Sequence, residues 1–192
     1  MKTYLSQGDV GKLLEAADNL RDYLIIKTLW STGMRVSELI GIKTTDVDPS
    51  SNTISIVHLK ASGAERHRLV PVHHSLANEL LDYVSKAKIK DGERIFPINR
   101  QTVSARLMVT AEKAGFGGKV LTNPESMRKH NVSPHKLRDA LAVHWLKKKN
   151  TIEGMKALQG VLGHANYNTT ARYFKLNIDD VRRVYNEVLG ED

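Results

Sequence analysis

The sequence contains no cysteine among its 192 residues. Disulfide bonds, a thiol nucleophile and cysteine-ligated zinc are therefore excluded as features of this chain. An H-E-x-x-H motif and a cluster of carboxylates are also missing, so no stretch of the sequence indicates a metal site. Any chemistry has to rest on other kinds of side chain.

Two further absences concern location. The sequence has no secretory leader and no apolar run long enough to cross a membrane. We therefore expect an intracellular, cytoplasmic protein with no membrane partner. Hydrophobic residues make up 41% and charged residues 26%, which is ordinary for a globular protein. The length suits a single domain with a sizeable core.

Positive charge is what the chain has in excess. The formal net charge is +8, and residues 51–150 alone hold 18 basic and 8 acidic side chains. The parts before and after this stretch are close to neutral. Such a concentration favours nucleic acid as a partner, while a solvated basic face is the alternative that needs no partner.

Hydrophobic periodicity predicts a mainly helical chain. Ser6 and Asp9 resemble a capping box that opens a first helix, and a largely buried helix over 22–31 is broken at Gly33. Further helices are predicted over 34–40, 75–90, 101–114, 134–149, 154–162, 168–175 and 178–189.

One small antiparallel sheet is predicted beside these helices. Residues 53–59 alternate apolar and polar side chains and are rich in β-branched residues, which is typical of a strand. Residues 66–72 are the predicted partner strand, with 61–64 at the hairpin tip. Residues 115–132, rich in glycine, asparagine and lysine, are predicted to form a surface loop. The expected fold class is mainly α with a small antiparallel β-sheet (α+β).

The stretch from 133 to 175 carries the densest set of candidate functional residues. Ser133 is predicted to cap a helix whose first position is Pro134. His135 and Arg138 then share a helix face near its N-terminus, where an anion is the natural ligand. Because most neighbouring apolar side chains line other faces, this pair is predicted to point away from the core.

Arg35 is a second candidate, beside the helix break at Gly33. Its guanidinium can bind two phosphate oxygens at once. The alternatives are a surface arginine paired with Glu38, or a helix-turn-helix in which two short helices flank the glycine.

Lys60, His164 and Tyr173 are each ambiguous when considered alone. Lys60 lies at a strand end and can give a proton if nearby cations lower its pKa, but it also fits an ordinary hairpin lysine. His164 follows Gly163 at a predicted helix end, where a histidine can simply cap carbonyls. A tyrosine such as Tyr173 becomes a nucleophile only with help in losing its proton.

Taken together, these residues stand in five motifs with a distinctive order. The motifs are T-G-M-R-V-S-E-L at 32–39, Lys60 before R-L-V-P-V at 68–72, S-P-H-K-L-R-D at 133–139, L-G-H at 162–164 and T-T-A-R-Y at 169–173. The set resembles the catalytic domain of the tyrosine recombinase (phage integrase) family, in its Xer-like form. The resemblance implies that residues 1–192 are a single catalytic domain, without the N-terminal core-binding (SAM-like) domain, of prokaryotic, viral or mobile-element origin.

The resemblance also implies a reaction. Tyr173 would attack a scissile phosphodiester, forming a 3′-phosphotyrosyl link and freeing a 5′-hydroxyl. Arg35 and Arg138 would hold the phosphate oxygens, and Glu38 would support Arg35. Lys60 would give a proton to the leaving oxygen, His135 would act as a proton relay and His164 would hydrogen-bond the phosphate. No cofactor, metal or ATP, is expected.

Double-stranded DNA is the implied partner, bound by a homo-oligomer (a tetramer on DNA, with a monomer in isolation as the alternative). Candidate DNA-binding residues are Arg66, Arg68, Lys136 and Arg172. Because the hairpin tip is longer and less glycine-rich than the usual G-K-G form, Arg66 and Arg68 are also alternatives to Lys60. The implied function is site-specific recombination or integration. Type IB topoisomerase-like relaxation and a non-cleaving DNA-binding accessory protein remain the alternatives.

Overall fold

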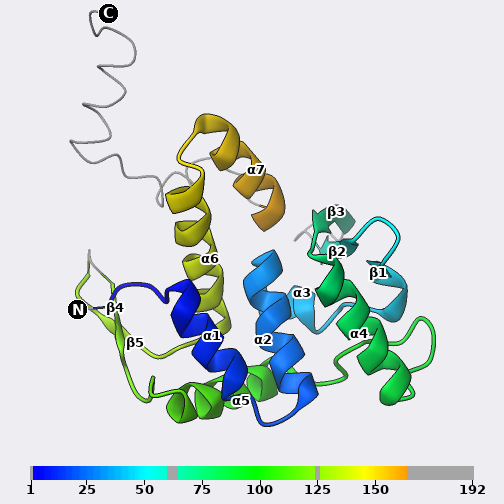
Figure 1. Cartoon of the computed structure of the whole chain (residues 1–192), viewed down its shortest axis with the longest axis horizontal. Coiled ribbons are helices and arrows are strands. Elements are labelled where there is room, and N and C mark those ends of the chain that lie inside the picture. Colours follow the sequence, from blue (N-terminus) through cyan, green and yellow to red (C-terminus); the bar gives the residue numbers. More distant parts are fainter. Residues whose placement is uncertain (1, 60–64, 124–125, 164–192) are drawn as a thin grey trace, which may run out of the picture.

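The computed structural model describes residues 2–59, 65–123 and 126–163 (Figure 1). Helices account for most of them, which confirms the expected mainly α fold. The helices are α1 (Gln7–Glu15), α2 (Leu20–Thr32), α3 (Val36–Leu39), the 3-10 turn η1 (Thr44–Asp46), α4 (His74–Lys86), α5 (Arg100–Lys113), α6 (Pro134–Lys148) and α7 (Ile152–Leu162).

Helix α2 is the centre of the molecule. Its apolar side chains Leu24, Ile26 and Leu29 are fully buried, and it contacts α1, α3, α4, α5 and α6 (Figure 1). A helix surrounded in this way needs apolar residues on more than one face, and the sequence of α2 supplies them. Gly33 ends it in the left-handed conformation with φ of 59°, as a helix-terminating glycine should.

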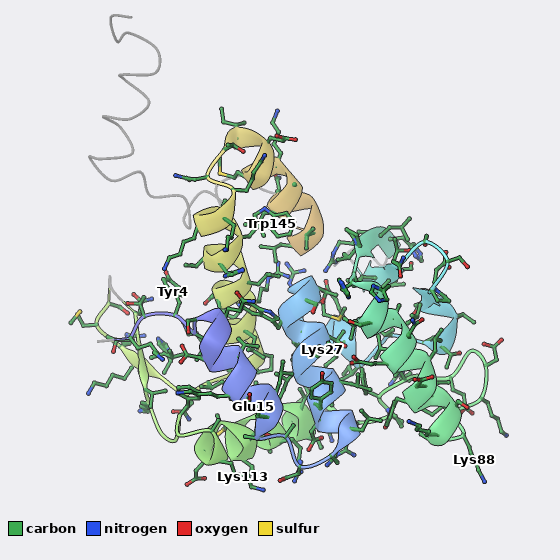
Figure 2. The ribbon with its side chains drawn as sticks, in the orientation of Figure 1. Tyr4, Glu15, Lys27, Lys88, Lys113 and Trp145 are labelled. Carbon is green, nitrogen blue, oxygen red and sulfur yellow. The ribbon has the colours of Figure 1, made fainter. Side chains whose placement is uncertain are left out.

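Side chains join α2 and α6 to their neighbours. The Lys27 ammonium on α2 lies 2.6 Å from a carboxylate oxygen of Glu79 on α4. Trp145, where α6 faces α7, donates its indole N–H to the carbonyl of Gly154 at 3.0 Å (Figure 2). These contacts fix the helices that later carry the candidate site.

Three antiparallel strands form a sheet in the order β1–β2–β3, with β1 at Val47–Asp48, β2 at Thr53–Leu59 and β3 at Glu65–Pro71. In the β2–β3 register Ile54 pairs with Val70 and Ile56 pairs with Arg68. The predicted strands are thus confirmed to within a residue. The predicted tip at 61–64 lies outside the described residues.

The predicted surface loop at 115–132 is wrong in two respects. It holds a second, two-stranded sheet, β4 (Leu121–Thr122) with β5 (Lys129–His130), and the side chains of Leu121 and Val132 are buried in the core. Single apolar residues among glycines and lysines form no periodic pattern, so the sequence carried no sign of their burial.

Helix boundaries also differ from the prediction, by up to four residues. The helix predicted over 75–90 ends at Lys86, because Lys88 adopts a left-handed backbone with φ of 54°. The helix predicted over 34–40 shrinks to α3, four residues long, with Arg35 as its N-cap. The helices predicted over 168–175 and 178–189 lie outside the described residues.

None of the described helices is long and apolar enough to span a lipid bilayer.

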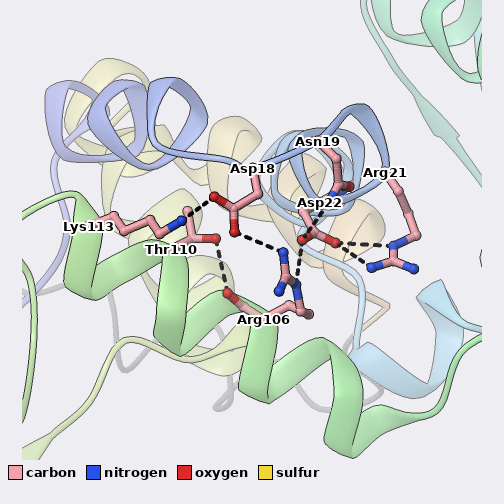
Figure 3. A network of polar contacts seen from close by, with 7 residues as sticks. All are labelled: Asp18, Asn19, Arg21, Asp22, Arg106, Thr110 and Lys113. Atoms are coloured by element: carbon pink, nitrogen blue, oxygen red, sulfur yellow. Dashed lines mark hydrogen bonds and ion pairs between the residues drawn. The ribbon is translucent and has the colours of Figure 1, made fainter.

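A network of polar side chains holds the N-terminal end of α2 against α5 (Figure 3). The buried Asp22 accepts two hydrogen bonds of 3.1 Å from Arg21 and one of 2.6 Å from Arg106 Nε. Arg106 also bonds Asp18 at 2.9 Å, and Lys113 pairs with the same carboxylate. This network lies at the opposite end of α2 from Gly33.

Candidate active site

Four separate segments of the chain meet at the C-terminal end of α2. Gly33 and Arg35 follow that end directly, Arg138 comes from α6, Leu162 ends α7, and Arg68 comes from β3. Gly33 is needed for this approach, since a Cβ built there would lie 2.5 Å from Leu162 and 2.8 Å from Leu141. Residues from four of the five sequence motifs thus come together through tertiary contacts.

Arg35 and Glu38 form the pair that their spacing suggested. Glu38 Oε2 accepts the backbone N–H of Arg35 at 2.8 Å, and Glu38 Oε1 lies 3.0 Å from Arg35 Nη1. The Arg35 side chain stays 39% exposed, whereas the carboxylate is buried. A helix-turn-helix is excluded here, because α2 is buried on several faces and α3 is only one turn long.

A second arginine shares the same carboxylate. Arg68 donates from Nη1 to Glu38 Oε1 at 3.1 Å and from Nη2 to Oε2 at 2.8 Å, which is a bidentate pair. Burial by itself would raise the pKa of Glu38. The hydrogen bonds from Arg68 and the Arg35 backbone, with both positive charges, bring that pKa below its ordinary value instead. Glu38 is therefore ionised at neutral pH.

Arg138 is buried, so the prediction that the H-x-x-R pair points away from the core is wrong for this residue. Its side chain is 3% exposed, and its guanidinium donates to the carbonyl oxygens of Gly33 and, at 2.8 Å, Leu162. Carbonyls at helix C-termini carry partial negative charge and attract a cation. The apolar neighbours of Arg138 in the sequence could not reveal that two helix ends would close over it.

His135 is the exposed member of the H-x-x-R pair. Its side chain is 65% exposed, and Nε2 lies 3.6 Å from Asp139 Oδ1 on the next turn. Lys136 Nζ lies 3.4 Å from the same carboxylate group. The predicted start of this helix is confirmed, with Ser133 as N-cap and Pro134 in the first position.

An open groove of about 1100 Å³ begins at His135. It runs between the start of the chain at Thr3 and Tyr4, the side of α5, the β4–β5 hairpin and the outer face of α6. Among the described residues, its lining holds one carboxylate, Asp139, and more lysines and histidines: Lys119, Lys129, His130, His135, Lys136 and Lys147. A groove of this charge suits a polyanion.

Lys60, His164, Arg172 and Tyr173 lie outside the described residues, as does the side chain of Arg66. Within the part of the chain that the structure describes, no three histidine, aspartate or glutamate side chains gather in a way that would hold a metal ion.

Arg68 is the residue whose position was least expected. It was named as a candidate DNA-binding residue and as an alternative to Lys60, yet its side chain is only 14% exposed and is bonded to Glu38. The strand pairing explains this position. Arg68 and Val70 are two residues apart and so lie on the same face of β3, where they pair with the core residues Ile56 and Ile54.

The chain is similar to named recombinases over most of its length. The model of the phage integrase family matches residues 3–179. Tyrosine recombinase XerA of Pyrococcus horikoshii is 31% identical over 181 residues, which make up 93% of this chain and 58% of that protein. Tyrosine recombinase XerC of Staphylococcus aureus is 30% identical over 175 residues, 89% of this chain and 54% of that protein.

Solved structures share the fold. The crystal structure of XerA recombinase superposes with a TM-score of 0.70 at 27% identity, covering 100% of this chain and 67% of that one. The XerH site-specific recombinase bound to difH substrate, in a pre-cleavage complex, superposes with a TM-score of 0.71 at 19% identity, covering 96% and 54%. The chain thus spans little more than half the length of its curated relatives.

Proposed function

The chain belongs to the phage integrase family, and from that premise we propose that it cleaves and rejoins DNA as a site-specific tyrosine recombinase. The observation that carries the proposal is the meeting of Arg35 and Arg138 at one end of α2, with Glu38 between two arginines. Two relatives at 30% identity or above are named tyrosine recombinases. Two arginines at the same helix end suit a phosphate that gains charge during reaction.

In the proposed reaction the Tyr173 oxygen attacks the scissile phosphorus. A bond forms between tyrosine and the 3′-phosphate while the bond to the 5′-oxygen breaks. The tyrosine proton passes to His135, and Lys60 gives a proton to the departing 5′-oxygen. Attack by another 5′-hydroxyl reverses these steps and joins new strands, so no external energy source is consumed.

Arg35, Arg138 and His164 stabilise the charge on the non-bridging oxygens in the proposed transition state. Arg138 is already held by two backbone carbonyls before any substrate arrives. A donor fixed in advance needs no reorganisation during the reaction, which is the main source of electrostatic catalysis. Arg35 is the more exposed of the two described arginines and meets the phosphate from the solvent side.

Double-stranded DNA is the proposed substrate and partner. The basic groove that begins at His135 supports this, and Lys136 at its edge is a proposed backbone contact. Arg66 and Arg172 are proposed as further DNA contacts. Strand exchange between two sites requires several active sites, so a homo-oligomer on DNA, a tetramer, is part of the proposal. Because the named relatives come from an archaeon and a bacterium, the cytoplasm is the proposed compartment.

The test is covalent attachment to DNA. Wild-type protein and Tyr173→Phe are incubated with supercoiled plasmid in the presence of EDTA, and the reaction is stopped with detergent. We expect protein–DNA adducts from the wild type and none from the variant, which lacks the oxygen nucleophile. Tyr83→Phe is a control that also removes one tyrosine hydroxyl, from a residue on α4 that does not line the basic groove.

The positions of the adducts separate the alternatives. Adducts mapped by sequencing to one recurrent site support a recombinase, whereas scattered adducts with relaxed circles favour the topoisomerase-like alternative. Adducts from Tyr173→Phe at the wild-type level contradict the assignment of the nucleophile. DNA binding without adducts from any variant supports the non-cleaving accessory protein.

A further inference from the structure

Arg68 occupies a core-facing position on a strand whose neighbouring leucine faces solvent. Leu69 is 70% exposed, while Arg68 lies on the same side of β3 as the buried Val70. Placing a leucine outside and an arginine inside is unfavourable for burial of apolar surface. The inward arginine must therefore gain from specific partners.

Those partners hold all three nitrogens of the guanidinium. Nη1 and Nη2 bond the two oxygens of Glu38, and Nε donates to the carbonyl oxygen of Val161 at 3.1 Å. The partners come from positions 30 and 93 residues away in sequence. One side chain thus joins β3, α3 and the last turn of α7.

The packing around Gly163 is shaped by the same guanidinium. A Cβ at this position would lie 2.9 Å from Arg68 Nη1 and 3.0 Å from Cζ. Gly163 also has a left-handed backbone, with φ of 65°. The L-G-H motif therefore needs glycine for two reasons, its backbone conformation and the space that Arg68 occupies.

Charge explains why one arginine does not suffice. If Arg35 alone paired with Glu38, the two charges would cancel and little positive potential would face a DNA phosphate. Arg68 brings a second positive charge and takes both carboxylate oxygens, so the three groups together carry one net positive charge. Arg35, the more exposed of the two, is where that charge can act.

We propose that Arg68 is a positioning residue, which neutralises Glu38 so that the charge of Arg35 remains available to the scissile phosphate and holds the end of α7 next to it. This inference rests on the proposed recombinase function. It assigns Arg68 a role inside the protein, through Glu38 and α7, in place of direct contact with DNA.

The experiment compares Arg68→Gln, Arg68→Lys, Glu38→Gln and the double variant Arg68→Gln/Glu38→Gln in the plasmid adduct assay. We expect Arg68→Gln to slow adduct formation at saturating DNA by about 30-fold, while the Kd for DNA changes less than about 3-fold. Removing the unneutralised carboxylate in the double variant should restore about 5-fold or more of that loss. Arg68→Lys keeps the charge but lacks the planar guanidinium that binds both carboxylate oxygens, so its rate of adduct formation should lie between those of Arg68→Gln and wild type.

Arg106→Gln is the matched control, because Arg106 also braces a buried carboxylate but lies at the other end of α2. It should leave the adduct rate of the folded protein unchanged. All rates are divided by the folded fraction from circular dichroism. The role is overturned if Arg68→Gln weakens the Kd and its salt dependence while the rate at saturation is unchanged, which is the behaviour of a DNA contact. Equal rates for the single and double variants also overturn it.

Failure of the proposed function is visible separately, as absence of adducts from the wild type. In that event inorganic phosphate is the probe, titrated while the arginine Nε–Hε NMR signals are followed. Phosphate binding at Arg35 that weakens about 5-fold or more in Arg68→Gln and recovers in the double variant upholds the role of Arg68. Equal phosphate affinity in wild type and Arg68→Gln contradicts it.

Discussion

The two ends of α2 are each held by a buried carboxylate and two arginines, yet the two networks differ in what they leave exposed. Near the N-terminal end, Asp22 is bonded by Arg21 and Arg106, whose side chains both reach solvent (Figure 3). Just beyond the C-terminal end, Glu38 is bonded by Arg35 and Arg68. In this second network Arg68 is largely buried, whereas Arg35 is 39% exposed.

The difference shows how the same ion pairs serve two purposes. At Asp22 one arginine, Arg106, joins α5 to α2, while Arg21 belongs to α2 itself. At Glu38 the bidentate arginine comes from a distant strand, and the arginine next to the carboxylate in sequence keeps its exposed side. A network that only stabilises the fold can thus be distinguished from a site that keeps an arginine available to a ligand by comparing how deeply its arginines are buried.

The largest effects are expected from removing each carboxylate. Glu38→Ala and Asp22→Ala should each lower the free energy of unfolding by about 3 kcal/mol, the usual cost of breaking a buried ion pair from one side. Urea denaturation measures this. Only Glu38→Ala should also reduce DNA adduct formation of the folded protein. An equal loss of adducts in folded Asp22→Ala would erase the distinction between the two ends.

The next largest effect on stability is expected where the Arg68 guanidinium packs against Gly163. Gly163→Ala should lower the free energy of unfolding by about 2–3 kcal/mol, because the left-handed backbone is strained and the Arg68 guanidinium must also move away from the new methyl group. Gly92→Ala is the control, since Gly92 has φ of 76° and nothing lies within 4 Å of a Cβ there. Its cost should be about 1 kcal/mol, from the backbone alone. Equal losses of unfolding free energy for the two variants in urea denaturation would mean that the Arg68 side chain moves aside without a measurable penalty.

Loss of Arg106 should have a smaller effect on stability than loss of Asp22. In Arg106→Gln the Asp22 carboxylate keeps its two hydrogen bonds from Arg21 and one from the side-chain amide of Asn19, so its burial remains compensated. The thermal midpoint should fall less than in Asp22→Ala, and adduct formation should not change. A midpoint as low as that of Asp22→Ala would show that Arg106 alone supports the carboxylate.

The smallest effect concerns pH. The folded-state pKa of Glu38 is below its ordinary value of 4.5, so its contribution to stability is complete above pH 4.5 and is lost as pH falls through the folded-state value. Thermal midpoints measured from pH 6 to pH 3 should therefore fall less steeply in Glu38→Gln than in wild type. Identical slopes would indicate that the arginines do not perturb this carboxyl.

Much of the fold could be predicted because its signals are local. The capping box of Ser6 and Asp9, the break at Gly33 and the start of α6 at Ser133 all depend on contacts within a few residues, and all are confirmed. The β4–β5 sheet could not be predicted, since its buried residues follow no period. The burial of Arg138 was likewise hidden, because the carbonyls that bond it belong to other helices.

The sequence by itself determined the family, the order of the motifs and the kinds of side chain available for phosphate chemistry, since these are properties of residue identity and spacing. It also determined the Arg35–Glu38 pair, which spans one helical turn. Only the tertiary structure decided that Arg68 completes this pair and reaches Val161, 93 residues away. Such contacts depend on how strands and helices pack around α2, and short-range propensity carries no information about that packing.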